Sequence, residues 1–274
     1  MVKRYLLKLS KITLIALIFA YCAALAYLFV FQRNYLFVPS TLEISPQDVG
    51  LPEAQVIKLK THDGETLIAW WIPPKDHKDV SIFLHGNADR LDQRVLRFKD
   101  MIKNGNGVFA LSYRGYGGST GAPSERGFYE DARTAYEWLN KKVSSKRIII
   151  HGYSIGTGVA TRLSAEKESK ALVLEAPFLS AIAVAQQRYS IFPVSWLMWD
   201  TFRSDQYIQL VHTPVIILHG SADRTIPLKQ AYALYQLALE PKQIIIFEGG
   251  EHTNLGSVGA LEAIQKFIDK ITEH

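Results

Sequence analysis

The chain reads Gly152-Tyr153-Ser154-Ile155-Gly156 between an apolar run at 147–151 and a segment at 157–163 that predicts a helix. A serine between two glycines at a strand-to-helix corner is typical of a nucleophile elbow, where the sharp turn excludes bulky neighbours. The turn pushes the serine oxygen out at the carboxyl end of the strand, and the helix directs backbone N–H groups at charge that develops there. We therefore predict that Ser154 is a nucleophile, the alternative being a serine that caps the helix.

A serine hydroxyl needs a base to take its proton, and His252 is the histidine best placed to serve. It lies in a loop with Gly249 and Gly250, directly after an apolar strand at 243–247. The two glycines let that loop bring the imidazole over the edge of the sheet. His212 and His219 only flank another strand, and the alternative for His252 is a surface histidine without a role.

The acid that orients such a base is predicted at Asp223. It follows the apolar strand 214–218, so it should lie at the same edge of the sheet as Ser154 and His252, where ligand-binding groups of open α/β sheets gather. Glu175 also ends a strand and is a competitor. Asp200 and Asp205 compete less well because no strand precedes them.

An oxyanion in this arrangement needs two N–H donors. We expect one from Ile155, the residue after the nucleophile, and the other from Asn87, in the loop after the strand 80–84. His85 precedes Ser154 in the chain and is expected to shape this loop through hydrogen bonds, with a place in the substrate pocket as a second possibility.

Several of these segments together resemble the α/β-hydrolase superfamily. More narrowly they resemble its small serine hydrolases with an N-terminal membrane anchor, a group of bacterial proteins with relatives among eukaryotic protein depalmitoylases. The resemblance covers residues 31–272 and implies nucleophile Ser154, acid Asp223, base His252 and the oxyanion residues named above, without supplying a substrate. It rests on the elbow and on 31–40, His85-Gly86-Asn87-Ala88, 113–119, Ser221-Ala222-Asp223 and Gly250-Glu251-His252.

Apolar strands and helices alternate along the chain, which predicts an α/β domain over 32–274 with helices on both faces of a mostly parallel sheet. Eight strands are expected, at 54–60, 66–72, 80–84, 107–112, 147–151, 171–175, 214–218 and 243–247, the first two forming a hairpin. Helices are expected at 90–103, 124–141, 154–168, 228–239 and 255–271.

The segment 178–213 is too long for a simple connection and predicts a cap over the active site. Its aromatic residues are expected either to line an apolar substrate pocket or to pack on the core or against a bilayer. Those named for the pocket are Phe178, Phe192, Trp196 and Trp199.

Composition excludes several other classes of protein. The net charge is +5, but four of the positive residues lie in the first eleven, so the rest of the chain carries no bias toward nucleic acid. The single cysteine, Cys22, excludes an internal disulfide. No zinc-type cluster of Cys and His and no phosphate-binding loop occurs, so we expect neither a metal nor a cofactor.

Residues 12–31 carry no charge and, as a helix, would span about 30 Å, the thickness of a bilayer core. We expect them to form a signal anchor behind a basic tail at 1–11. The tail predicts a cytoplasmic N-terminus with the hydrolase domain on the far side, the periplasm in a bacterium. A cleaved signal peptide, with a site at Ala24-Leu25-Ala26, and a buried core helix are the alternatives.

The chain is thus expected to be a membrane-anchored serine hydrolase that cleaves carboxylic esters or thioesters of a small or lipid-like substrate. A serine peptidase or amidase with the same triad and a non-enzymatic anchored scaffold are the alternatives. Depalmitoylation would need a domain facing the cytosol, which the charge pattern disfavours.

Overall fold

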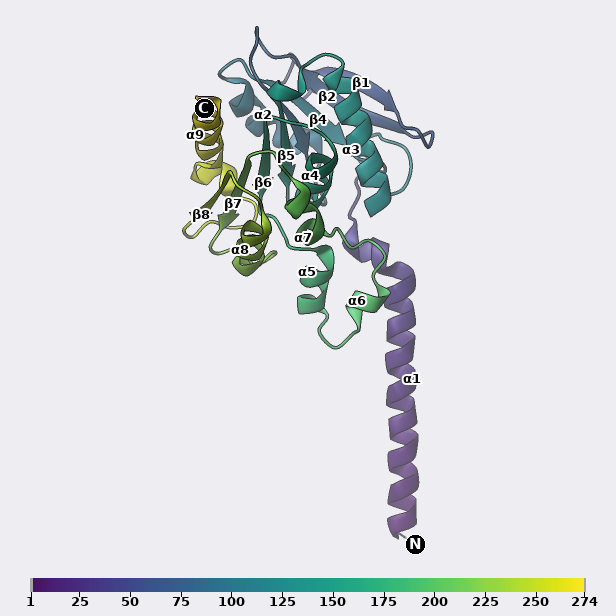
Figure 1. Ribbon diagram of the computed structural model, residues 1–274. Coiled ribbons are helices and arrows are strands. Elements are labelled where there is room, and N and C mark those ends of the chain that lie inside the picture. The colour runs from purple at the N-terminus through teal and green to yellow at the C-terminus, as the bar shows by residue number, and fades with distance from the viewer. Residues whose placement is uncertain (1, 274) are drawn as a thin grey trace.

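A computed structural model of the chain describes residues 2–273, so Met1 and His274, with the predictions that fall on them, lie outside the described residues. Its centre is an eight-stranded sheet in the order β1-β2-β4-β3-β5-β6-β7-β8 (Figure 1). The first two strands pair antiparallel, β2 pairs antiparallel with β4, and every later pair is parallel. The strands are β1 (Gln55–Lys60), β2 (Thr66–Ile72), β3 (Val80–Leu84), β4 (Gly107–Ser112), β5 (Ile148–Tyr153), β6 (Ala171–Glu175), β7 (Val215–Gly220) and β8 (Lys242–Phe247). This confirms the predicted mostly parallel sheet.

Helices cover both faces of the sheet because its strands are apolar on both sides. Adjacent residues Ile82 and Phe83 of β3 belong to two different buried clusters, and so do Ile149 and Ile150 of β5. On one face pack α3 (Glu125–Asn140), α4 (Ile155–Glu166) and α8 (Leu228–Leu237). On the other pack α2 (Val95–Ile102) and α9 (Ala260–Thr272).

Two predicted helices begin as tighter turns. The segment expected at 90–103 starts with the 3-10 turn η1 (Leu91–Arg94). Another short 3-10 turn, η2 (Ser145–Arg147), lies outside these helices and leads into β5. The segment expected at 255–271 splits into η4 (Leu255–Val258) and α9, because Gly259 between them has a φ of 101°, which interrupts right-handed helical geometry.

The segment 178–213, predicted as a cap and called the cap below, contains four short helical elements. They are α5 (Ala181–Arg188), α6 (Val194–Leu197), α7 (Ser204–Tyr207) and η3 (Ile208–Leu210). Its second half returns to the domain, where Phe202 and Ile208 are buried in the core cluster under α4. Its first half, α5 and α6, hangs below the domain beside the long N-terminal helix (Figure 1).

That N-terminal helix, α1 (Val2–Leu36), has 35 residues and is about 52 Å long. Among the described residues it is the helix long and apolar enough to cross a membrane, from Lys3 to Leu36. Its C-terminal part is tied to the cap. Gln32 Nε2 donates to the carbonyl of Leu197 at 3.1 Å, and Arg33 Nε lies 2.7 Å from Oδ2 of Asp200. The helix therefore continues five residues past the predicted end of the apolar span and joins the folded domain.

Candidate active site

Ser154 occupies a strained turn between β5 and α4. Its φ of 53° and ψ of −121° are unusual for a residue with a side chain, and such strain persists only where the surroundings enforce it. A Cβ at Gly156 would collide with the carbonyl of Leu84, and one at Gly152 would collide with the carbonyl of Gly156. The Ser154 N–H donates to the carbonyl of Glu175 at 2.9 Å. These contacts explain why glycine stands on both sides of the turn.

The structure brings the three predicted catalytic side chains together. Ser154 Oγ lies 2.9 Å from Nε2 of His252, and Nδ1 of His252 lies 2.7 Å from Oδ2 of Asp223. They come from the ends of β5, β8 and β7, which meet at one edge of the sheet because these strands are parallel. The spacing is that of a nucleophile, a base and the acid that orients it.

Asp223 is buried and its second carboxylate oxygen is also occupied. Oδ1 accepts hydrogen bonds from the N–H groups of Thr225 and Ile226, both at 2.8 Å. Burial acts to raise the pKa of Asp223, but the hydrogen bond with His252 and those two N–H groups outweigh it and lower the pKa below its usual value. The carboxylate is therefore ionised at neutral pH and available to accept from the imidazole.

The competing acids have other partners. Glu175 is buried in contact with Arg97 and His151; burial acts to raise its pKa, but the Arg97 charge and the His151 hydrogen bond hold it at about 2. Asp200 accepts from Arg33 and from the Glu125 N–H. Asp205 pairs with Arg203 at 2.7 Å. The two histidines weighed against His252 also lie elsewhere. His212 is exposed, and His219 Nε2 lies 2.9 Å from the Ile226 carbonyl.

The two predicted oxyanion residues, Asn87 and Ile155, line the same cavity as Ser154. The loop that carries Asn87 is held from several sides. Asn87 Nδ2 donates to the Leu36 carbonyl at 2.7 Å, and its Oδ1 accepts from the Val38 N–H and the Tyr116 hydroxyl, both at 2.9 Å. The side chain of Asn87 therefore fastens this loop to the end of α1.

The cavity that reaches Ser154 has a volume of about 380 Å³ and lies between α1 and the cap. Of the residues predicted for the pocket, Phe178 and Phe192 line it. The remaining lining is mostly apolar and comes from Leu25, Leu28, Phe29, Gln32, Tyr35 and Leu36 of α1, from Ala181, Val184, Ala185, Arg188, Tyr189, Val194, Leu197 and Met198 of the cap, and from Thr225 and Ile226.

The described lining of this cavity does not include three of the residues named for the pocket, His85, Trp196 and Trp199. His85 is buried between the rings of Tyr113 and Tyr116, and its Nδ1 lies 2.7 Å from the Gly86 carbonyl, so it shapes the loop. Trp199 packs against Phe29, with ring centroids 5.0 Å apart. Trp196 lies on short α6 and is 88% exposed.

Sequence reasoning missed two contributions to the site. Tyr153 donates from its hydroxyl to the His252 carbonyl at 2.9 Å, and its position inside the elbow pentapeptide was the available signal. The wall formed by α1 was also missed. A run such as 25–31 shows only that it is apolar, and nothing in it distinguishes a lipid-facing helix from one that also lines a cavity.

Across residues 2–273, no group of three or more His, Cys, Asp or Glu side chains is arranged to hold a metal ion.

Several known proteins resemble this chain in sequence or in fold. Residues 75–203 match the family described as serine aminopeptidase, S33. An uncharacterized protein of Mycobacterium tuberculosis is 32% identical over 244 residues, covering 86% of this chain and 87% of that protein. The lysophosphatidylserine lipase ABHD12 of Danio rerio is 31% identical, covering 77% of this chain and 66% of the lipase. The crystal structure of the Pyrococcus furiosus esterase Pf2001 superposes with a TM-score of 0.68 at 21% identity, covering 85% of this chain and 98% of the esterase.

Proposed function

This chain belongs to the α/β-hydrolase superfamily, and we propose that, as a serine hydrolase of that group, it cleaves carboxylic esters or thioesters through an acyl-enzyme intermediate. The observation that most supports the proposal is the continuous hydrogen-bonded series from Ser154 Oγ through His252 to Asp223. Such a series activates a serine hydroxyl, which is otherwise a weak nucleophile at neutral pH.

In the proposed reaction, Ser154 Oγ attacks the substrate carbonyl while His252 Nε2 takes the hydroxyl proton. The Asp223 carboxylate keeps the Nδ1 proton of the imidazole in place and stabilises the imidazolium that forms. The N–H groups of Ile155 and Asn87 stabilise the oxyanion. His252 then protonates the leaving alcohol or thiol, and a water molecule repeats the sequence to release the acid and restore Ser154.

The apolar lining favours a substrate with a hydrocarbon chain. Phe29, Phe178 and Phe192 lie in the same cavity as the Ser154 hydroxyl, so a carbonyl can reach the serine while its acyl chain contacts apolar side chains. The name of the lysophosphatidylserine lipase among its relatives agrees with an acyl ester of lipid type.

A peptidase or amidase is the second candidate, because the family that matches residues 75–203 is described as a serine aminopeptidase. Both reactions use the same three side chains, so a panel of ester, thioester and aminoacyl-amide substrates separates them. Turnover of the amides alone would favour the peptidase, and no turnover of any of them would favour an anchored scaffold.

We propose further that α1 is retained as a membrane anchor with the hydrolase domain on the far side of the membrane from the basic residues. Lys3, Arg4, Lys8 and Lys11 support this orientation, since positive charge stays on the cytoplasmic side. Alkaline extraction tests the anchor: the protein should stay with the membrane pellet, whereas a cleaved signal peptide would leave it soluble.

Labelling with a fluorophosphonate probe tests the proposed nucleophile. The wild-type protein should be labelled covalently and the Ser154→Ala variant should not. Labelling that persists in the variant would place the reactive serine elsewhere and reject the proposed site.

A further inference from the structure

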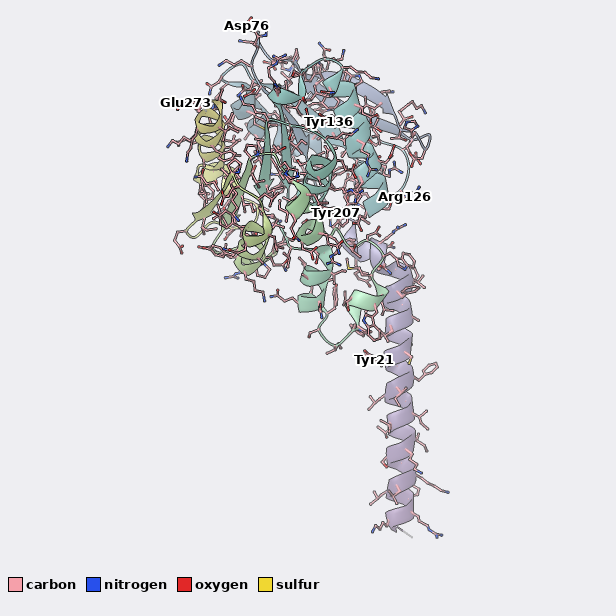
Figure 2. The ribbon with its side chains drawn as sticks, viewed as in Figure 1. Tyr21, Asp76, Arg126, Tyr136, Tyr207 and Glu273 are labelled. Carbon is pink, nitrogen blue, oxygen red and sulfur yellow. The ribbon has the colours of Figure 1, made fainter. Side chains whose placement is uncertain are left out.

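The cap contacts α1 deep within its apolar span. Tyr21 lies midway along 12–31, about 15 Å from either end of that span. Its hydroxyl donates to the Ile191 carbonyl at 2.8 Å, and its ring stacks on Phe192 with centroids 5.6 Å apart. Figure 2 shows Tyr21 at the level of the loop between α5 and α6. If 12–31 crosses the bilayer, the tip of the cap lies at the depth of the hydrocarbon.

A shift of the helix along the membrane normal does not easily bring the tip of the cap out of the hydrocarbon. For Tyr21 to reach the far interface, the membrane would have to hold roughly the 20 residues before it, which places Lys11 near the middle of the span. An ammonium group at the centre of a membrane helix is strongly disfavoured. The cap tip is therefore more easily accommodated inside the bilayer than Lys11.

The cap tip, defined here as residues 189–199, has the surface that such a position requires. It contains no charged residue between Arg188 and Asp200. Ile191 is 73% exposed and Trp196 is 88% exposed, so its largest outward side chains are apolar, and the exposed polar ones, Ser190 and Ser195, are small and uncharged. Tryptophan is enriched where proteins meet the membrane interface.

The backbone of the cap tip is also largely satisfied without water, as a segment in lipid must be. Pro193 has no N–H group to satisfy. Trp199 donates from its N–H to Oε1 of Gln32 at 2.7 Å. Further N–H groups bond to carbonyls within the cap, namely those of Tyr189, Phe192, Val194, Trp196 and Met198.

The cavity continues from this depth to the nucleophile. Leu25, Leu28 and Phe29, all within the apolar span, form one wall, and Phe192 of the cap tip belongs to the opposite wall. Ser154 lies in the same cavity. A hydrocarbon chain can thus pass between α1 and the cap to the serine along a lining that is mostly apolar, with Gln32 and Arg188 among its polar members.

We propose that the cap tip is immersed in the leaflet next to the hydrolase domain and that long-chain acyl esters of membrane lipids enter laterally between α1 and the cap. This deepens the proposed serine hydrolase function and rests on it. The reaction is the hydrolysis already described, in which Ser154 takes the acyl group, the lipid alcohol leaves with a proton, and water releases the fatty acid.

The test uses the full chain reconstituted in phosphatidylcholine vesicles and two substrates, a long-chain acyl ester embedded in the bilayer and a short ester dissolved in water. The variant Ile191→Glu/Trp196→Glu places two carboxylates on the cap tip at side chains that do not line the described cavity. We expect at least a tenfold loss with the embedded ester and an unchanged rate with the soluble one. Leu96→Glu is the matched control, because Leu96 is 78% exposed on α2, away from the cap, and should change neither rate.

The outcomes separate the two proposals. Wild-type protein that fails to hydrolyse the soluble ester rejects the hydrolase function, whereas a double variant that retains both rates rejects lateral entry alone.

A second measurement reports immersion without activity. Lipids brominated on their acyl chains should quench wild-type tryptophan fluorescence, and Trp196→Phe should remove a large part of that quenching. Equal quenching in the two proteins, or a cap tip shielded from lipid by a second copy of the chain, would overturn the proposal.

Discussion

The hydroxyl of Tyr153 donates to the backbone carbonyl of His252 at 2.9 Å, which joins the residue before the nucleophile to the residue proposed as its base. The two residues are 99 positions apart in the chain. Arg94 lies over the Tyr153 ring, 4.4 Å from its centroid, and pairs with Asp89, whose carboxylate accepts from the Gly86 N–H. Tyr153 thereby holds the His252 loop against the loop of the proposed oxyanion site.

Tyr153→Phe keeps the ring and removes this one hydrogen bond. We expect kcat to fall about fivefold with little change in KM, because a net hydrogen bond contributes about 1 kcal/mol and here it positions the base. Steady-state kinetics with a soluble ester measures the effect. Tyr136→Phe is the control. Tyr136 lies on α3, away from the site, and makes the same kind of bond to the Glu168 carbonyl, so its loss should leave kcat unchanged. Equal kcat in both variants would show that the bond to His252 has no positioning role.

The proposed roles of Ser154 and Asp223 predict an order of damage. Ser154→Ala should lower kcat by about 10⁶ and Asp223→Asn by about 10⁴, as in comparable triads. Glu175→Gln should leave the kcat of the folded protein close to wild type, since Glu175 contacts Arg97 and His151 instead of His252. Single-turnover kinetics on purified, folded variants measures all three. A larger loss for Glu175→Gln than for Asp223→Asn would show that Glu175, and not Asp223, is the acid.

The close approach at Gly156 predicts that even a methyl group is harmful there. Gly156→Ala would press its Cβ on the Leu84 carbonyl, a backbone atom that cannot turn away. We expect the unfolding free energy to fall by about 1–3 kcal/mol. We also expect a large loss of kcat, because the turn that holds Ser154 would have to move away from β3. Gly256→Ala is the control. Its Cβ would meet only the end of the Arg97 side chain, at 3.3 Å, and should cost less in chemical denaturation.

The low pKa of Glu175 predicts an acid-sensitive contribution to stability. Its pKa is about 2 in the folded protein against an ordinary 4.5, so its ionised form stabilises the fold above pH 4.5, and the contribution is lost as the pH falls toward 2. The difference in unfolding free energy between wild type and Glu175→Gln should therefore be constant near neutral pH and shrink across that acid window. Denaturant titrations at stepped pH test this. Glu262→Gln, at an exposed carboxylate, should track wild type throughout.

Local patterns in the sequence were sufficient for most of the fold. Alternating apolar segments predicted all eight strands within a few residues, because burial on both faces requires nearly continuous apolar side chains. The elbow could be recognised in the sequence because its glycines are required by close backbone contacts, either a few residues away or on the adjacent strand β3. Ser154, Asp223 and His252 could be named because each follows a strand, and parallel strands bring their carboxyl ends to one edge.

Tertiary structure alone decided which groups occupy that edge and what surrounds them. Glu175 and Asp223 both end strands, and only packing shows that Arg97 contacts one while His252 contacts the other. Packing also turned Trp196 outward and made α1 a wall of the cavity. The physical reason is that residue type and spacing determine backbone conformation over a few positions, whereas the partner of a side chain depends on segments, such as α1 and the cap, that are far apart in the chain.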